Sequence, residues 1–172
     1  TRTAGVLAGR LSALGYQVTT GVGGTGIVGV LRNGDGPTVL LRADMDGLPV
    51  LERTGLEYAS TATGSRDGLD LPVAHACGHD MHMACLIGAA AELAAQPAAE
   101  PQAWTGTVLI VGQPAEEIGR GARAMVEDGL FERFGTPDVV LGQHVAPAPA
   151  GTIGLRPGPA FAASDGIRVV LH

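Results

Sequence analysis

The chain has 172 residues, a length typical of one domain, and 45% of them are apolar, which excludes a disordered or low-complexity protein. Its formal net charge is −6 and it contains no basic run, which argues against nucleic acid or a membrane surface as a partner. All 11 basic residues are arginines, so chemistry that needs a lysine is excluded. Two cysteines are too few for a disulfide scaffold, and no apolar run reaches the length of a membrane span. We therefore expect a soluble, cytoplasmic, globular protein.

Helical and extended patterns alternate along the chain. The first part is predicted to form a helix and then three short strands, at residues 1–14, 17–20, 27–32 and 38–42. The glycines between Gly21 and Gly26 resemble a phosphate-binding loop, but a strand rather than a helix follows them, so we interpret them as a turn. Residues 43–76 show no sustained period and are rich in Gly, Pro, Asp and Thr, which is typical of functional loops.

The second part contains the clearest helix, at residues 81–95, for which Asp80 is placed as a cap. The pattern then predicts a linker at residues 97–105, a buried strand at 107–111 and a helix at 121–134. Three further strands are predicted at residues 139–144, 152–155 and 167–171. Cys85, Trp104 and Phe131 are expected to pack in the core. The alternation of strands and helices predicts an α/β three-layer sandwich with a mixed, largely parallel sheet.

The densest chemistry lies in the sequence HACGHDMH at residues 75–82, which holds three histidines, a cysteine and an aspartate just before a helix. Cys77 and His79 are two residues apart, so in an extended loop their side chains point to the same side and can share a metal ion. The alternative is a buried structural cysteine with surface histidines. That alternative would leave most of the five histidines of the chain without a role.

Carboxylates and a histidine follow the buried strands. Glu116 and Glu117 come after strand 107–111, at the end of a strand where ligands bind in open α/β sheets. Adjacent carboxylates in such a position need a cation or a proton to compensate them, and their different directions suit one to metal binding and the other to general-base catalysis. The alternative is an ordinary helix N-terminus, where acidic residues favour the dipole. His144 ends the next strand and is interpreted as a further ligand, the alternative being an ordinary core or surface histidine.

Two aspartates, Asp44 and Asp46, follow strand 38–42 and can face the same cleft to orient metal ligands, unless they only build a turn. Cysteine, histidine and carboxylate donors together suit zinc, with cobalt, nickel or manganese as alternatives. Four candidate ligands exceed what a single open zinc site needs, so we expect a pair of ions that activates one water. A carboxylate beside that water would pass its proton to a leaving amine, which predicts metal-assisted hydrolysis of an amide.

Four motifs in this order, RADMDGLP, HACGHDMH, GQPAEE and GQHV, resemble the di-metal amidohydrolase family of aminoacylases, hippurate hydrolases, indoleacetyl-amino acid hydrolases and related carboxypeptidases. The segments GVGGTGIVGVLR and GPAFAASD extend the resemblance over nearly the whole chain. It implies a zinc-exopeptidase-like fold, two divalent metal ions, and N-acyl amino acids or small peptides as substrates. It also implies a general base at Glu116, an acid that orients a ligand at Asp46, and metal ligands at Cys77, His79, Glu117 and His144.

The resemblance also sets expectations for domain organisation. Residues 1–172 would form the first part of a metal-dependent catalytic domain, with the lid or dimerisation domain, the C-terminal catalytic part and one further histidine ligand absent from this chain. We expect the full-length protein to be a homodimeric enzyme and the isolated chain to be inactive. A non-catalytic metal-binding or interaction module on the same scaffold is the alternative, and the length of the encoded reading frame distinguishes the two.

Overall fold

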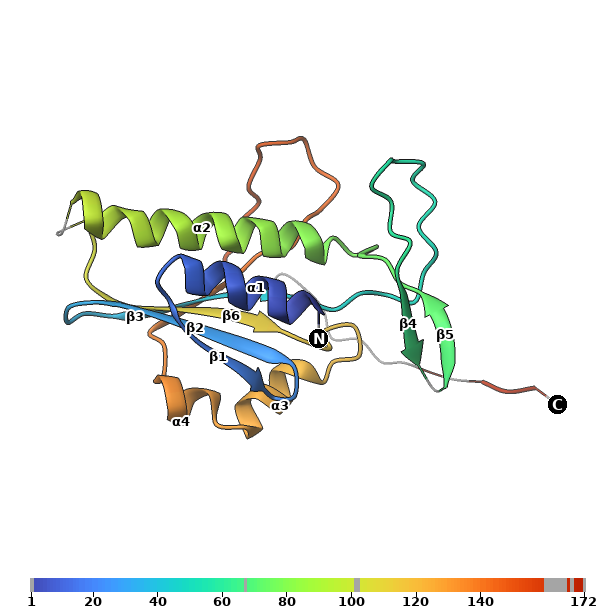
Figure 1. Cartoon of the computed structure of the whole chain (residues 1–172), viewed down its shortest axis with the longest axis horizontal. Helices are drawn as coiled ribbons and strands as arrows, with labels where there is room; N and C mark the ends of the chain where they lie inside the picture. The colour runs from blue at the N-terminus through green and yellow to red at the C-terminus, as the bar shows by residue number, and fades with distance from the viewer. Residues whose placement is uncertain (1, 67, 101–102, 160–166, 168, 172) are drawn as a thin grey trace.

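The computed structural model describes residues 2–66, 68–100, 103–159, 167 and 169–171, and its core is a sheet with helices on both faces (Figure 1). Helices α1 and α2 cover one face, and α3 and α4 cover the other. The three-layer α/β architecture expected from the sequence is therefore confirmed. The elements in chain order are α1 (Arg2–Ala13), β1 (Gln17–Val22), β2 (Gly26–Asn33), β3 (Thr38–Asp44), β4 (Thr63–Arg66), β5 (Leu69–Pro72), α2 (His79–Ala99), β6 (Gly106–Gln113), α3 (Gly121–Glu127), α4 (Leu130–Phe134) and β7 (Val139–Gly142).

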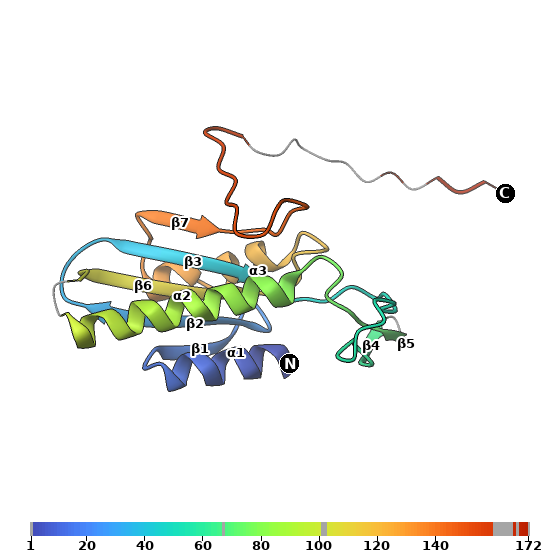
Figure 2. The ribbon, with the colours of Figure 1, turned by 90° about the horizontal axis from the view of Figure 1, so that it is seen from above.

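The main sheet is mixed, with the strand order β1-β2-β6-β3-β7. The β1–β2 and β2–β6 pairs are antiparallel, whereas β3 pairs in parallel with both β6 and β7. The carboxyl ends of β3, β6 and β7 consequently meet at one edge of the sheet, and α2 begins at that same edge (Figure 2). Because ligand sites in such sheets form beyond the carboxyl ends of the strands, this edge is where a site is expected.

Alternate residues of the central strands supply two hydrophobic cores. On β2, Ile27 packs toward α1 and α2, while its neighbour Val28 packs toward α3 and α4. On β6, Ile110 packs toward α1 and α2, and its neighbour Leu109 packs toward α3 and α4. Side chains alternate across a strand, so a continuous apolar run is what a strand covered on both faces requires. Among the described helices, none has the length and hydropathy to span a membrane.

Helix α2 begins two residues before the predicted start and continues through Pro97 in its last turn. Its N-cap is Gly78, which has a left-handed backbone, and no side chain caps the helix. The prediction that Asp80 is the cap was therefore wrong: Asp80 lies in the first turn, where its carboxylate accepts a hydrogen bond from the N–H of Met81. Cys85, expected in the core, is exposed on α2.

Three other segments differ from the expectation. The helix predicted over 121–134 is broken into α3 and α4 at Gly129, whose φ of 81° lies in the left-handed region. Residues 43–76, expected to lack regular structure, contain the β4–β5 hairpin. Residues 152–155 form no strand. Of the predicted strand 167–171, every residue except 168 is described and none of these is in a strand, so that prediction was wrong. The GPAFAASD segment lies largely outside the described residues.

Candidate metal centre

The structure brings all six predicted site residues together at the carboxyl edge of β3, β6 and β7. His79, in the first turn of α2, lies at the centre of the group and is only 1% exposed. Around it the ligand-type atoms of the predicted site residues form two overlapping groups, each with its atoms within 4.8 Å of one another. One group consists of Cys77, His79 and His144, and the other of His79, Glu116 and Glu117.

Hydrogen bonding fixes which nitrogen of His79 faces the group. Nδ1 lies 2.9 Å from the backbone oxygen of Asp46, and because a carbonyl can only accept, Nδ1 carries the hydrogen. Nε2 therefore presents its lone pair. It lies 3.6 Å from Oε1 of Glu117 and 3.8 Å from Oε2 of Glu116, with no hydrogen-bond partner. A buried imidazole lone pair that faces carboxylate oxygens is the arrangement that a cation would stabilise.

Three buried side-chain nitrogen or oxygen atoms of the described residues have no hydrogen-bond partner, and all three belong to this cluster. They are Oδ1 of Asp46, Nε2 of His79 and Oε1 of Glu117. Buried polar atoms are almost always paired in folded proteins, so a cluster of unpaired acceptors requires an explanation. Thiol sulfur, imidazole nitrogen and carboxylate oxygen are donors that zinc and similar divalent ions accept, so the residues present fit a metal centre.

Cys77 and His144 form the more exposed side of the group. Sγ of Cys77 lies 3.4 Å from Nε2 of His144. Nδ1 of His144 donates to the backbone oxygen of Val145 at 2.7 Å, so its Nε2, like that of His79, carries the lone pair. Partial burial raises the pKa of the Cys77 thiol, and the neighbouring Glu117 carboxylate adds to the rise. A bound cation would act in the opposite direction and favour the thiolate.

The turn after β6 holds the two glutamates in different surroundings. Ala115, which precedes them, has a φ of 51°, and it is the one non-glycine residue of the described chain with a left-handed backbone. The carboxylate of Asp46 accepts a hydrogen bond from the N–H of Glu117 at 3.1 Å, which ties the turn to the end of β3. The Glu117 side chain is 22% exposed and directs a buried oxygen at His79, whereas that of Glu116 is 38% exposed.

A buried pair lies directly behind His79, formed by Asp44, which the sequence analysis expected to orient metal ligands, and His82, to which it gave no separate role. His82 Nδ1 and Asp44 Oδ1 are 2.6 Å apart, and both side chains are fully buried. Burial opposes ionisation of Asp44, but the hydrogen bond from His82 and the charge of Arg42 outweigh it and lower the pKa of this carboxyl. The HACGHDMH motif indicated only that His82 lies near the site, since His79 and His82 are three residues apart and so share one face of α2.

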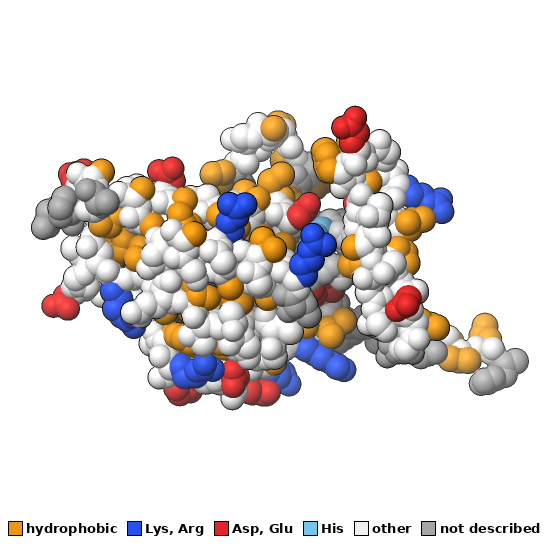
Figure 3. Space-filling model, viewed as in Figure 1, with side chains coloured by type: hydrophobic (Ala, Val, Ile, Leu, Met, Phe, Trp, Pro, Cys, Tyr) orange, Lys and Arg blue, Asp and Glu red, His pale blue; other side chains and the backbone are white. Residues whose placement is uncertain are grey.

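A cleft of about 930 Å³ adjoins the motif, between the first turns of α1 and α2 and the loop before the β4–β5 hairpin. Figure 3 shows this hollow beside the hairpin, with a histidine visible in it. Its lining includes His75, whose Nδ1 lies 3.1 Å from the same Asp46 carbonyl that His79 contacts. The cleft therefore opens next to the candidate metal centre and has room for a small organic molecule.

A three-layer α/β domain with thiolate, imidazole and carboxylate donors at its strand ends has the construction of a metal-dependent hydrolase. The chain belongs to peptidase family M20/M25/M40, which it matches over residues 40–169. It is 44% identical to a hippurate hydrolase of Campylobacter jejuni over 84% of this chain and 34% of the relative. It is 39% identical to an N-acetyl-L-cysteine deacetylase of Bacillus subtilis over 94% of this chain and 36% of the relative.

Among solved structures, the fold resembles the Bacillus subtilis YXEP protein, described as a dinuclear metal binding peptidase from the M20 family. The TM-score is 0.76 at 34% identity, and the match covers 92% of this chain and 41% of the other. The chain thus spans between a third and about two fifths of the length of these relatives. Family and fold are established by these similarities.

Proposed function

We propose that the protein containing this chain hydrolyses the amide bond of N-acyl amino acids or small peptides with the help of divalent metal ions. The observation that carries the proposal is the pair of unpartnered buried atoms, His79 Nε2 and Glu117 Oε1, facing each other at 3.6 Å. The relatives named hippurate hydrolase and N-acetyl-L-cysteine deacetylase, which act on N-acyl amino acids by name, support this substrate class.

Cys77, His79, Glu117 and His144 are the proposed metal ligands. Two ions are proposed rather than one, because four ligand side chains exceed the three that a single catalytic zinc site takes from the protein, and the similar YXEP protein is described as dinuclear. Zinc is the preferred metal for a set that combines sulfur, nitrogen and oxygen, with manganese, cobalt or nickel as alternatives. When bound, the ions would polarise the scissile carbonyl and lower the pKa of a water molecule at the site.

Glu116 is the proposed general base. Its side chain is the more exposed of the two glutamates, so its carboxylate can reach a water molecule and the substrate in front of the cluster. It takes a proton from the attacking water at a carboxylate oxygen and returns it to the leaving amine nitrogen. Asp46 is the proposed positioning acid: its backbone oxygen fixes the His79 tautomer, and its carboxylate holds the N–H of Glu117.

We further propose that residues 1–172 form the first part of the catalytic domain. The lid or dimerisation domain and the remaining catalytic part would then lie in other parts of a longer, homodimeric protein. The extent of the relatives supports this division, since the chain matches 34% of the hippurate hydrolase and 36% of the deacetylase.

The test combines metal analysis of the full-length protein with a hydrolysis screen of hippurate, N-acetyl amino acids and dipeptides. We expect two equivalents of metal per subunit, release of the free amino acid, and loss of activity on chelation that is restored by added zinc, manganese or cobalt. A protein that retains its metal and releases no amino acid from any of these substrates would instead be a metal-binding or interaction module.

A further inference from the structure

His82 is fully buried beside the candidate metal centre, close to both His79 and His144. Its ring centroid lies 5.4 Å from that of His79, with the two rings tilted, and 4.5 Å from that of His144, with the two rings edge-on. Geometrically, Asp44, His79 and His82 form a third group of ligand-type atoms within 4.8 Å of one another. His82 is therefore close enough to the others to be mistaken for a metal ligand.

The hydrogen bonds of His82 leave no nitrogen for a metal ion. Its Nε2 accepts a hydrogen bond from the backbone N–H of Val145 at 2.9 Å, and since a backbone N–H can only donate, Nε2 uses its lone pair there. The hydrogen of the ring is then on Nδ1, which donates to Oδ1 of Asp44 at 2.6 Å. The ring is thus fully engaged by a carboxylate on one side and a backbone amide on the other.

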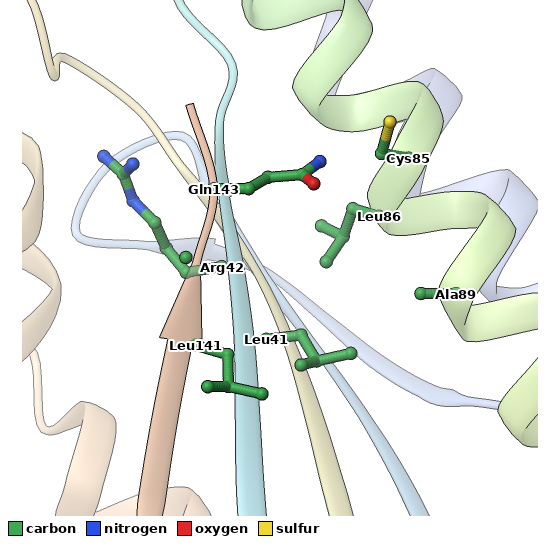
Figure 4. Close-up of a pocket in the computed structure, with 8 residues that line it drawn as sticks. Leu41, Arg42, Cys85, Leu86, Ala89, Leu141 and Gln143 are labelled. Atoms are coloured by element: carbon green, nitrogen blue, oxygen red, sulfur yellow. The ribbon is translucent and has the colours of Figure 1, made fainter. Parts of the chain in front are cut away.

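The backbone that His82 holds is the loop that carries His144. Strand β7 ends at Gly142, so no sheet hydrogen bond of that strand fixes the position of His144. Val145 on one side of His144 donates to the His82 ring, and Gln143 on the other side donates from Nε2 to the His82 backbone oxygen at 3.4 Å. Figure 4 shows Gln143 directed from the end of β7 toward α2, above a small cavity of about 130 Å³.

We propose that His82 is a positioning residue that fastens the loop of His144 to helix α2, so that Nε2 of His144 faces Sγ of Cys77. Asp44 completes the arrangement, because its carboxylate holds Nδ1 of His82 and is held in turn by Arg42 at 2.9 Å. The chain of contacts runs from the end of β3 through α2 to the loop after β7. The expectation that His82 supports metal binding rests on the proposed function, because it requires His144 to be a metal ligand. The expectation that His82 fixes the position of His144 is independent of that function.

Two substitutions separate the two hydrogen bonds of the ring. The amide of asparagine lies near the position of Nδ1, so His82→Asn keeps a donor for Asp44 and loses the acceptor for Val145. The longer side chain of glutamine reaches the position of Nε2, so His82→Gln keeps an acceptor for Val145. Met83→Leu, a volume-conserving change at the next residue of α2, is the control for packing in that helix.

The first measurement is the ¹⁵N spectrum of histidine side chains in the metal-free full-length protein, with signals assigned through His82→Gln and His144→Ala. In the unsubstituted protein we expect both His82 and His144 to carry hydrogen on Nδ1. The His144 signals should keep their positions in His82→Gln and Met83→Leu but shift or broaden in His82→Asn. Unchanged His144 signals in His82→Asn would overturn the proposal, as would hydrogen on Nε2 of His82.

The second measurement is zinc affinity, with cobalt absorption as a report on the thiolate and imidazole ligands. We expect His82→Asn to bind zinc about 10–100-fold more weakly, the range for residues that orient a ligand, and His82→Gln to lose clearly less. Equal losses in both variants, accompanied by equal losses of thermal stability, would show a purely structural role and overturn the proposal. If His144→Ala binds zinc as tightly as the unsubstituted protein, the proposed function fails, while the histidine spectrum still decides the placement of His144.

Discussion

Glu116 and Glu117 are neighbours in the chain, but their side chains have different environments. Glu117 directs a buried, unpartnered oxygen at His79, whereas Glu116 is more exposed. We therefore expect Glu116→Gln in the full-length protein to retain its metal while turnover falls by about 10²–10⁴-fold, the range for a positioned general base. Glu117→Gln should lose metal, because it removes a charged ligand from the cluster. Metal content and hydrolysis of hippurate, measured side by side, check both expectations, and an exchange of the two phenotypes would mean that the roles are reversed.

Cys77 and Cys85 provide a second test that does not depend on activity. Cys77 is half-buried beside His144, while Cys85 is exposed on α2. A thiolate held by a metal ion is shielded from alkylating reagents. Cys77 should therefore react slowly with iodoacetamide in the metal-loaded full-length protein and faster after chelation, as read by mass spectrometry of the peptides. Cys85 is the internal control and should react at the same rate with and without bound metal. If Cys77 also reacts at the same rate in both states, Cys77 is not a metal ligand.

The sequence motifs were sufficient to predict that Cys77, Glu117 and His144 gather around His79, but not that His82 does. Cys77 lies beside His79 as predicted, although it lies in a turn before α2 and not in the expected extended loop. The ends of two strands place Glu117 and His144 at the same edge of the sheet. The part played by His82 could not be predicted, because it depends on which backbone N–H meets which ring nitrogen across 63 residues of chain. The roles of the six residues remain predictions until the substitutions above are measured.

At the scale of elements, the turn between β6 and α3 depends on Gly121. A Cβ atom at this position would lie 1.5 Å from the backbone oxygen of Pro114, so the turn would have to move. We expect Gly121→Ala to destabilise the fold by about 1–3 kcal/mol, as overpacking of a tight contact does, and to weaken metal binding by displacing Glu117.

The control for this substitution is Gly88→Ala on α2. Gly88 is exposed, and a Cβ atom at this position would meet no other atom within 4 Å, so alanine should stabilise the helix by about 0.5–1 kcal/mol. Urea unfolding of both variants measures the difference. A Gly121→Ala protein as stable as the Gly88→Ala protein would show that the turn tolerates displacement.

Tyr16 connects the start of β1 to α2, since its hydroxyl donates to the backbone oxygen of Ala90 at 3.0 Å. Burial raises the pKa of Tyr16 to about 12. The unfolded chain loses this proton near pH 10 and the folded chain keeps it, so the free energy of unfolding should fall between about pH 10 and 12. In Tyr16→Phe we expect that fall to be smaller and the stability at neutral pH to be about 1 kcal/mol lower.

Unfolding curves at pH 8, 10 and 11.5 measure the pH dependence of the free energy of unfolding. The control is Tyr58→Phe, because the Tyr58 side chain is 82% exposed and gains nothing from burial. The Tyr58 variant should follow the unsubstituted protein at every pH. If the free energy of unfolding falls equally with pH in the unsubstituted protein and in both variants, the fall above pH 10 is not due to Tyr16.

Elements with strong apolar patterns were predicted well, and short or glycine-interrupted ones were not. The central strands β2, β3 and β6 form close to their predicted positions because each is a run of β-branched and apolar residues that packs against helices on both faces. The β4–β5 hairpin was missed because its strands have four residues each and include Gly64 and Pro72, which have low strand propensity. The break at Gly129 was missed because a single glycine in an amphipathic pattern is normally a tolerated helix residue.

At the scale of the whole chain, the edge strand β7 is the least covered part of the sheet. Val139, Val140 and Leu141 are all exposed, although strands of this kind are normally buried on both faces. An apolar edge strand with free backbone groups is a surface that pairs readily with another chain. The chain also matches 34–41% of the lengths of its relatives, and the four proposed ligand side chains are few for two ions.

We therefore predict that the isolated 172-residue chain self-associates, binds metal only weakly, and releases no measurable amino acid from hippurate or N-acetyl amino acids in excess zinc, manganese or cobalt. Size-exclusion chromatography with light scattering, zinc titration and the hydrolysis assay measure the three properties, with the full-length protein as the positive control. Val140→Arg, placed on exposed β7, should reduce the association by adding charge to the edge without restoring activity. Turnover by a monomer of the isolated chain at about 1 s⁻¹ or more, the range of ordinary enzymes, would show that residues 1–172 hold a complete active site.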